Sequence, residues 1–430
     1  MAESDGDGEG GVMVTDTLRV GPRPFHLMAK PTGAVCNLDC DYCFFLSKEA
    51  LYPGSTFRMA EATLEAYLRG LLTAHSGQPE VVVAFQGGEP TLMGMPFFAR
   101  VLELERELAQ PGQRVTNTLQ TNATLIDDEW AAFLVANSFL VGVSVDGPRE
   151  MHDAYRTDKG GKPTFDRVMR GLAALKRQGA DWNALTTVNA ANMQDGGGVY
   201  RFLRDDLGAQ FIQLIPVVER QEGDRVTHRS VTAAAYGRFM IDVFEEWVRR
   251  DVGAVFVQAF DTALAHWMGL PDMGLCVHAE TCGRSLALEH NGDVYSCDHF
   301  VEPAHLVGNL ADGRTLLQIV ESPQQRAFGR AKREGLPHQC VRCEVRFACH
   351  GGCPKDRFLT TADGEPGLNY LCEGYRALFR HVDEPMRVMA SVVARGGEAA
   401  AVMPWYGRRN AQVNGGRAGP VGVGGKEVRT

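Results

Sequence analysis

Apolar and polar positions alternate in blocks through the first half of the chain. Short runs rich in apolar and β-branched residues predict six strands, at residues 25–29, 81–85, 115–120, 140–145, 184–188 and 211–217. Longer segments with helical periodicity lie between them, for example at 60–73, 96–109, 127–136, 165–178 and 198–207. Six β–α units in succession predict an α/β fold, with helices outside a parallel sheet that is either open or curved into a partial barrel.

Candidate functional residues follow the ends of these predicted strands. They are Cys36, residues 86–90, 120–122 and 144–146, and Asn189. In parallel α/β folds the C-terminal ends of the strands form one rim, where the chemistry collects. We therefore expect these segments to lie together.

The pattern changes in the second half of the chain. A helical pattern covers residues 231–250, and residues 270–380 are then rich in Cys, Gly and His with only short predicted elements. The predicted organisation is a tail (1–20), an α/β domain (21–235), a helical connection (236–269), a metal-binding domain (270–385) and a disordered Gly/Arg-rich tail (395–430).

Charge and hydropathy narrow the classes of partner. The net charge of −9 makes a nucleic-acid backbone an unfavourable partner. No apolar run approaches the roughly 20 residues that cross a bilayer, so no membrane association is expected. The acidic, Gly-rich start of the chain does not resemble a secretory signal, and a cytoplasmic protein is expected.

The eleven cysteines are clustered rather than scattered. Three lie within eight residues, at Cys36, Cys40 and Cys43, and the other eight lie between Cys276 and Cys372. Clustering of this kind indicates metal sites in a chain whose context looks cytosolic, where disulfides rarely persist. The C-x3-C-x2-C spacing can hold three irons of a [4Fe–4S] cluster and leave the fourth iron open for catalysis. A zinc site or unrelated core cysteines are the alternatives, but no fourth Cys or His ligand lies nearby.

The eight later cysteines suffice for two complete four-thiolate sites. They are Cys276, Cys282, Cys297, Cys340, Cys343, Cys349, Cys353 and Cys372. Two [4Fe–4S] clusters satisfy this count, and two zinc sites satisfy it equally.

Several residues on the predicted rim have the chemistry of ligand-binding groups. Gly88 lies in a Gly-Gly-Glu-Pro segment whose backbone can approach a ligand closely, and Glu89 can accept hydrogen bonds from an ammonium group. Ser144 can bind a hydroxyl or a carboxylate, and Arg156 can form a bidentate pair with a carboxylate. The alternatives are an ordinary strand-end turn at 86–90 and a solvated charge at Arg156.

The N-terminal cysteine motif resembles that of the radical S-adenosylmethionine (SAM) superfamily. The resemblance implies a partial (β/α)6 barrel and SAM bound to the open iron, which yields a 5′-deoxyadenosyl radical. It implies that Tyr42 contacts the adenine, that Gly88 and Glu89 hold the methionine amino group, and that Val218 covers the adenine. Ser144 then binds the ribose or the carboxylate, and Arg156 pairs with the methionine carboxylate.

Residues 270–380 resemble the SPASM extension of radical enzymes that modify peptides and proteins. The resemblance implies two auxiliary [4Fe–4S] clusters with interleaved ligands, and so three clusters in all. The first would be held by Cys276, Cys282, Cys297 and Cys353, and the second by Cys340, Cys343, Cys349 and Cys372.

Over residues 22–385 the chain resembles the anaerobic sulfatase-maturating enzymes most closely. The supporting stretches include CNLDCDYCFF, FQGGEPTL, LQTNATLID, FIQLIPVVER, NGDVYSCDHFV and CHGGCPKDRF. The family converts a sulfatase Cys or Ser to Cα-formylglycine. The resemblance implies that a flavodoxin or ferredoxin supplies the electron and that the second electron leaves through an auxiliary cluster. It also implies that Asp298 takes the substrate proton, and we expect burial near a cluster to raise the basicity of Asp298.

Phe45 departs from the family pattern, where a Tyr is expected. Two other functions compete with this interpretation. One is a SPASM radical enzyme that modifies a small ribosomally made peptide, although twenty tail-like residues leave little room for a precursor-binding domain. The other is a zinc-binding scaffold without enzymatic activity.

Overall fold

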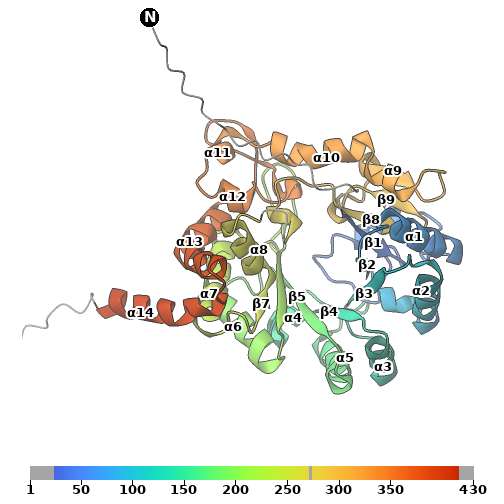
Figure 1. Cartoon of the computed structure of the whole chain (residues 1–430), viewed down its shortest axis with the longest axis horizontal. Helices are drawn as coiled ribbons and strands as arrows, with labels where there is room; N and C mark the ends of the chain where they lie inside the picture. The colour runs from blue at the N-terminus through green and yellow to red at the C-terminus, as the bar shows by residue number, and fades with distance from the viewer. Residues whose placement is uncertain (1–23, 271–273, 416–430) are drawn as a thin grey trace, which may run out of the picture.

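A parallel sheet forms the framework of the molecule. The computed structural model describes residues 24–270 and 274–415. Its six central strands are β1 (His26–Lys30), β2 (Glu80–Phe85), β3 (Arg114–Thr121), β4 (Leu140–Ser144), β5 (Trp182–Val188) and β6 (Phe211–Pro216), which pair in parallel in chain order. Each overlaps one of the six strands predicted from the sequence, so the predicted α/β fold is confirmed. The strands curve into a partial barrel (Figure 1).

Helices line the outside of this sheet, as Figure 1 shows. They are α1 (Glu61–Ala74), α2 (Met95–Leu108), α3 (Asp128–Ala136), α5 (Phe165–Gln178) and α6 (Gly196–Arg201), with the short α4 (Arg149–Asp153) at the end of β4. Local chemistry fixes their ends. Asp127 caps α3 by accepting a hydrogen bond from Trp130 N–H at 2.9 Å, and Gly179 ends α5 at a φ of 73°.

The cysteine-rich segment continues this same sheet. It contributes β8 (Ser285–Glu289), β9 (Asp293–Tyr295) and β10 (Leu306–Asn309), and β8 pairs in parallel with β1 along five residues. With the short β7 (Phe256–Val257) at the other edge, the sheet has ten strands in the order β10-β9-β8-β1-β2-β3-β4-β5-β6-β7. The sequence predicts a separate domain for this segment, whereas its strands join the central sheet.

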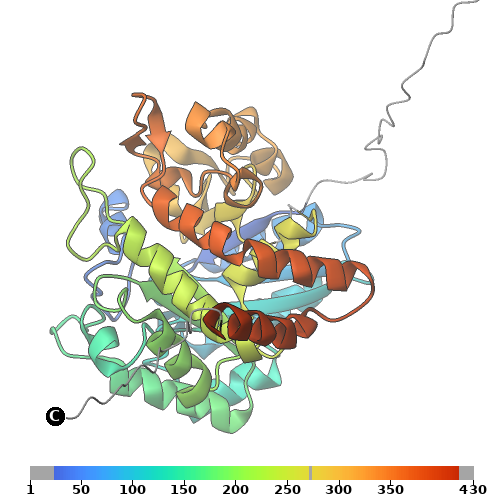
Figure 2. The ribbon, with the colours of Figure 1, turned by 90° about the vertical axis from the view of Figure 1, so that its left-hand side faces the viewer.

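Two long helices pack together outside the barrel, near β7 (Figure 1). Helix α7 (Ala233–Arg250) runs against α13 (Cys372–Ala394), and both are visible in Figure 2. A glycine from each helix permits the close approach, since a Cβ on Gly374 would lie 2.2 Å from Ala233 O. Cys372, the last cysteine of the chain, is thereby fixed at the first residue of α13.

The tail predicted over 395–430 is wrong in its first half. The chain forms α14 (Val402–Gly415), and Tyr406 is buried, with its hydroxyl donating to Glu245 of α7. Glycine and arginine in this stretch suggest disorder, but the apolar Val402 and Tyr406 lie one turn apart and dock on the body. The rest of this tail and the predicted tail at 1–20 lie outside the described residues.

The remaining elements link these parts. Helix α8 (Gln258–Trp267) forms the predicted helical connection together with α7, and α9 (Leu316–Val320), α10 (Pro323–Glu334), α11 (His338–Val341) and α12 (Arg346–Cys349) carry the chain between the later cysteines. Among the residues that the structure describes, no helix combines the length and the apolar character needed to span a bilayer.

Candidate active site and cysteine clusters

The three N-terminal cysteines lie on a loop that follows β1. Cys43 N–H donates to Cys40 O at 2.9 Å, which turns the loop back on itself, and all three side chains are half-buried. Their thiols lie close enough to interact electrostatically. Burial raises the pKa of Cys36 to about 11 and that of Cys40 to about 12, so metal binding here would release protons.

Asn122, directly after β3, reaches this loop. Its Nδ2 lies 3.6 Å from Cys36 Sγ and donates to Asn37 Oδ1 at 2.8 Å, while Leu38 N–H lies 3.4 Å from the same sulfur. Such N–H groups stabilise a negatively charged sulfur. The end of β3 and the cysteine loop therefore meet on one rim, as the strand-end pattern predicts.

The segment around Gly88 and Glu89 packs under the cysteine loop. Gly88 N–H donates to Gly33 O at 2.8 Å, and Glu89 N–H donates to Val35 O at 3.0 Å. A Cβ on Gly88 would lie 1.9 Å from Val35 O, so only glycine allows this approach. The close approach made at Gly88 is thus to the protein's own backbone, and the contact with the methionine amino group stays a prediction.

The Glu89 carboxylate is fully buried and anchors the rim. Its Oε1 accepts hydrogen bonds from Thr91 N–H (3.0 Å), the Thr91 hydroxyl (2.7 Å) and the Thr121 hydroxyl (2.8 Å). Its Oε2 accepts one hydrogen bond, from Asn122 N–H at 2.8 Å, and therefore keeps capacity for an ammonium donor. Burial raises the pKa of Glu89 against the effect of these donors.

Arg156 makes a different pair from the one expected. Its Nε and Nη2 donate to the two carboxylate oxygens of the buried Asp146, at 2.9 and 3.0 Å. The Tyr42 hydroxyl donates to the same carboxylate, and so does Thr187 N–H, at 2.9 Å. Burial alone would raise the pKa of Asp146, but Arg156, together with His152 and Tyr42, outweighs burial and lowers that pKa.

Asp146 therefore occupies the bidentate face of Arg156 that the sequence analysis assigns to a methionine carboxylate, and Nη1 is the nitrogen left for a further acceptor. The same carboxylate ties Tyr42, and with it the cysteine loop, to the ends of β4 and β5. Contact between Tyr42 and an adenine stays a prediction.

Ser144 and Val218 lie at two further strand ends. Ser144 is the last residue of β4, and its hydroxyl accepts a hydrogen bond from Gln120 Nε2 at 3.0 Å. Val218 follows β6 by two residues, half-buried against the core. Both lie on the rim, and their contacts with a cofactor stay predictions.

Asp298 lies beside the N-terminal cysteine loop although it is 255 residues beyond Cys43 in the chain. It forms an ion pair with Lys30, the last residue of β1, and Lys30 Nζ lies 3.9 Å from the centre of the Phe45 ring. Burial alone would raise the pKa of Asp298, but Lys30, together with His299 and Lys48, outweighs burial, and the pKa is lowered. The expected rise in basicity is therefore wrong, because the sequence analysis did not foresee this counter-ion.

The later cysteines gather into two sets. In the first, electrostatic interactions link each thiol to another member; we call Cys276, Cys282, Cys297 and Cys353 the first cysteine set. Burial raises the pKa of Cys353 to about 12. This grouping combines a residue from beyond Cys349 with three from before Cys340, as the SPASM resemblance implies.

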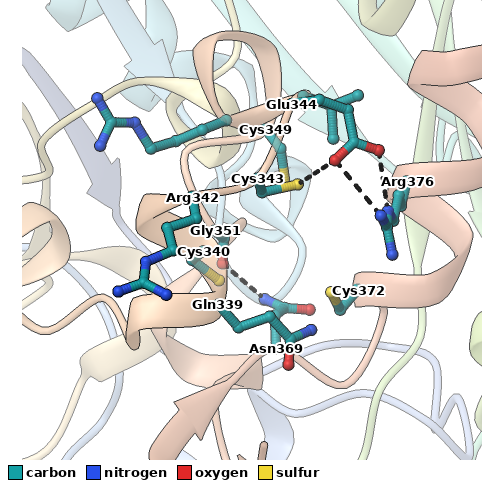
Figure 3. Close-up of a pocket in the computed structure, with 12 residues that line it drawn as sticks. Gln339, Cys340, Arg342, Cys343, Glu344, Cys349, Gly351, Asn369, Cys372 and Arg376 are labelled. Atoms are coloured by element: carbon teal, nitrogen blue, oxygen red, sulfur yellow. Dashed lines mark hydrogen bonds and ion pairs between the residues drawn. The ribbon is translucent and has the colours of Figure 1, made fainter.

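The second cysteine set is Cys340, Cys343, Cys349 and Cys372. These four residues line a cavity of about 170 Å³, and Figure 3 shows their sulfurs around it. Burial raises the pKa of Cys349 to about 12 and that of Cys372 to about 11.

The placement of the second-set thiols around a cavity favours a cluster over a single ion. Within residues 24–270 and 274–415, no three Cys, His, Asp or Glu side chains converge on a point that one metal ion could occupy. In a four-thiolate zinc site each sulfur lies about 2.3 Å from the single metal ion. In a four-iron cluster the four thiolates bind different irons and lie around a larger core. Thiols set around a cavity therefore fit a [4Fe–4S] cluster better than zinc.

Two residues of this site, Lys30 and Asp146, were not predicted individually from the sequence. A signal for Lys30 exists, since a charged residue that ends a buried strand needs a partner. Asp146 was grouped with the rim, but its pairing with Arg156 needs the turn through α4, which the sequence does not display.

Two family models match the chain. The Radical SAM superfamily model covers residues 31–203, and the iron–sulfur cluster-binding SPASM model covers residues 276–344. A serine-type anaerobic sulfatase-maturating enzyme of Bacteroides thetaiotaomicron is 42% identical, over 85% of this chain and 91% of the relative. A cysteine-type enzyme of Clostridium perfringens is 31% identical, over 83% of this chain and 96% of the relative.

Solved structures also match this chain. The structure "Native anSMEcpe with bound AdoMet and Cp18Cys peptide" matches with a TM-score of 0.76 and 30% identity, over 86% of this chain and all of that one. Streptococcus suis SuiB bound to S-adenosylmethionine matches with a TM-score of 0.58 and 18% identity, over 81% of this chain and 77% of that one, and shares the fold.

Proposed function

This chain belongs to the anaerobic sulfatase-maturating enzymes, radical SAM enzymes that convert a Cys or Ser of a sulfatase to formylglycine, and we propose that Asp298 takes the proton from that residue. As a member of this family the enzyme uses three [4Fe–4S] clusters and SAM. We assign the SAM-binding cluster to Cys36, Cys40 and Cys43, and the auxiliary clusters to the two cysteine sets.

The position of Asp298 is the observation that carries this proposal. The Lys30 ammonium pairs with Asp298 and lies over the ring of Phe45, two residues after Cys43. Next to them, the rings of Phe44 and His299 lie 5.3 Å apart between centres. A carboxylate that directly follows Cys297, a member of the first cysteine set, is thus held against the loop of the N-terminal cysteines.

The bound cofactors supply the radical that removes a hydrogen atom from the substrate Cβ. Asp298 receives the proton from the substrate sulfur or oxygen through a carboxylate oxygen, which its lowered pKa keeps ionised at neutral pH. Lys30 holds that carboxylate in place and balances its charge. Asp146 and Glu89 fix the strand ends on which the SAM-binding residues lie.

We propose that the enzyme accepts either a Cys or a Ser as the target residue of the sulfatase. The serine-type relative named above is more similar to this chain than the cysteine-type relative, at 42% against 31% identity. This difference supports a Ser target, and we expect a Ser-x-Pro-x-Arg peptide to react at least as fast as its Cys counterpart. Slower turnover of the Ser peptide would contradict it.

A reduced flavodoxin or ferredoxin is the proposed electron donor. The two carriers deliver single electrons at low potential, which the first cluster requires. The proposal places the enzyme in the cytoplasm, where thiols stay reduced. The test compares 5′-deoxyadenosine release when the enzyme is reduced by the purified carrier with release when it is reduced by dithionite.

Incubation with SAM, dithionite and a Cys- or Ser-containing sulfatase peptide tests the function. Wild-type enzyme should form 5′-deoxyadenosine and convert the peptide to the aldehyde, read as a mass change. Asp298→Asn should lower peptide conversion by about 100-fold or more, since a positioned base contributes that much, while deoxyadenosine still forms. Asp312→Asn, an exposed carboxylate paired with Arg314, is the matched control.

Two results would overturn the proposal separately. Full peptide conversion by Asp298→Asn at wild-type iron content would reject Asp298 as the base. Deoxyadenosine formation by the wild type without any change in either peptide would reject sulfatase peptides as substrates.

A further inference from the structure

Two cations beside the later cysteines, one buried and one half-buried, have no carboxylate partner. Lys332, on α10, is 1% exposed, and its Nζ donates to Cys276 O at 2.7 Å and Val277 O at 3.0 Å. Arg357 is half-buried and also hydrogen-bonds to backbone carbonyls. Neither side chain forms an ion pair with any residue in the described ranges, where the other buried cations Lys30 and Arg156 do.

The thiols around Lys332 belong to the first cysteine set. Its ammonium interacts electrostatically with the thiols of Cys276, Cys282 and Cys353. Its two hydrogen-bond acceptors are the carbonyls at and after Cys276, so the charge is fixed against the loop that presents this ligand.

Arg357 lies between the two sets. Its Nε donates to Gly351 O at 2.9 Å, and its Nη2 donates to His350 O at 2.7 Å and Gly352 O at 3.2 Å. These carbonyls form the short bridge from Cys349, in the second set, to Cys353, in the first. Gly351 also lines the cavity of the second set, and a Cβ there would meet Arg357 Nη2 at 2.8 Å.

A buried cation without a counter-ion is strongly unfavourable, so each of these charges needs a negative partner. Thiolate-ligated iron–sulfur clusters are anionic, and they become more so when reduced. A fixed positive charge close to a cluster therefore stabilises the reduced form more than the oxidised form, and net charge is one of the factors that set cluster potentials.

We propose that Lys332 raises the reduction potential of the first auxiliary cluster and that Arg357 raises the potentials of both. Lys332 acts on one cluster because its neighbours are members of the first set, whereas Arg357 faces members of both. The two residues thereby favour acceptance of the electron that leaves the substrate. Other nearby charges are already balanced: Lys30 by Asp298, and Lys355 by Asp356. The inference rests on the proposed placement of the auxiliary clusters.

The test is a redox titration of the reconstituted holoenzyme, followed by electron paramagnetic resonance. Lys332→Met should lower the potential of the first auxiliary cluster and leave the second unchanged. Arg357→Gln should lower both. We expect each shift to reach about a tenfold change in the ratio of oxidised to reduced cluster, which is about 59 mV for one electron.

Charge-retaining and surface variants separate charge from structure. Lys332→Arg and Arg357→Lys should keep the wild-type potentials. Arg330→Met removes an exposed charge from the same helix as Lys332 and should shift neither potential. Lys332→Gln is neutral but keeps a donor for the carbonyls, so it should match Lys332→Met in potential and serves if the Met variant loses iron.

Unchanged potentials in Lys332→Met or Lys332→Gln at full iron content would overturn the inference, as would an equal shift in Arg330→Met. If the neutral variants lose the iron of the first cluster while Lys332→Arg retains it, a charge requirement is supported. A wrong placement of the auxiliary clusters would give a different result: Cys276→Ala and Cys372→Ala would then keep the wild-type iron content.

Discussion

At the scale of single residues, the site depends on charges that are buried together with their counter-ions. Asp298 has Lys30, and Asp146 has Arg156, and in both pairs the carboxylate pKa is lowered although burial alone would raise it. Neither carboxylate needs a rise in pKa to take part in the chemistry. Each pair instead fixes a position: Asp298 beside the cysteine loop, and Tyr42 beside the ends of β4 and β5.

Removal of Lys30 should change how peptide conversion depends on pH. In Lys30→Met the Asp298 carboxylate stays buried without its cation, so its pKa should rise instead of fall. Over about pH 6 to 9 the variant should gain activity as the pH rises, whereas ionisation of Asp298 sets no limb in the wild type over that range. The unpaired charge should also cost about 3–5 kcal/mol of stability.

Rates of peptide conversion across this range, for protein of equal iron content, check the prediction. Lys30→Arg keeps the charge and should follow the wild-type profile. A Lys30→Met profile that parallels the wild type would show that Lys30 does not control the ionisation of Asp298.

At the scale of elements, strands and helices of the α/β half could be predicted and long-range pairings could not. The six strands each show in a short apolar run, and the periodic segments became helices. Strand β8 is equally apolar, but nothing in 285–289 states that its partner is β1 rather than another late strand. The division of eight cysteines into two interleaved sets is a matter of pairing too, and came from the family resemblance.

For the site, too, the positions of residues along the chain could be predicted, but their long-range partners could not. Strand-end positions placed Cys36, Glu89 and Asn122 on one rim. The partners of Arg156 and Asp298 depend on turns and on sheet order, and both were missed. Helix α14 was missed because Gly and Arg in its surroundings outweighed the apolar residues that dock it.

Gly88→Ala should disrupt the junction between β2 and the cysteine loop. The added Cβ would lie 1.9 Å from Val35 O, directly before Cys36, so the loop has to move. We expect the variant to lose roughly a third of its iron, which is the share of one cluster out of three. We also expect it to lose 5′-deoxyadenosine formation. Gly407→Ala, where nothing lies within 4 Å, is the matched control. Wild-type iron and deoxyadenosine in Gly88→Ala would contradict this account.

Helix α2 should carry a pH-dependent instability. Glu105 is buried against β3, accepts a hydrogen bond from Asn117 Nδ2 at 3.0 Å, and has its pKa raised to about 7 by burial. In the unfolded chain the Glu105 carboxylate ionises with a pKa of about 4.3. The folded state therefore loses stability as the pH rises from about 4 to 7, and the full penalty applies above about pH 7. The penalty is about 3–4 kcal/mol, at about 1.4 kcal/mol for each pKa unit.

Glu105→Gln removes this penalty and keeps the acceptor for Asn117. The variant should melt higher than the wild type at about pH 8 and at nearly the same temperature near pH 4 to 5. Glu103→Gln, on the exposed face of the same helix, should show no such difference. An equal gain at both pH values would refute the assignment.

At the scale of the whole molecule, the cysteine-rich segment has two different kinds of support. Its strands β8, β9 and β10 are built into the central sheet, where β8 lies against β1. Residues from 310 to 372 form short helices, loops and a small antiparallel pair of strands, β11 (Leu359–Thr360) and β12 (Pro366–Leu368), and they are gathered around the two cysteine sets. The first kind of support is a hydrogen-bonded ladder, and we expect the second to depend on metal.

Iron removal should therefore open one part of the molecule and spare another. Metal-ligand bonds contribute folding free energy wherever ligands join distant segments, and here Cys353 joins a loop to residues more than fifty positions earlier. After chelation of the iron under mild oxidation, brief protease treatment should cut between residues 310 and 372 first, while the β1–β6 half and β8–β10 stay intact. Mass spectrometry of the fragments locates the cuts. Cys372→Ala, which removes a ligand of the second set alone, should expose the stretch from 340 to 372 and leave earlier loops resistant. A first cut within β1–β6, or the same pattern with and without iron, would mean that packing rather than metal holds this segment.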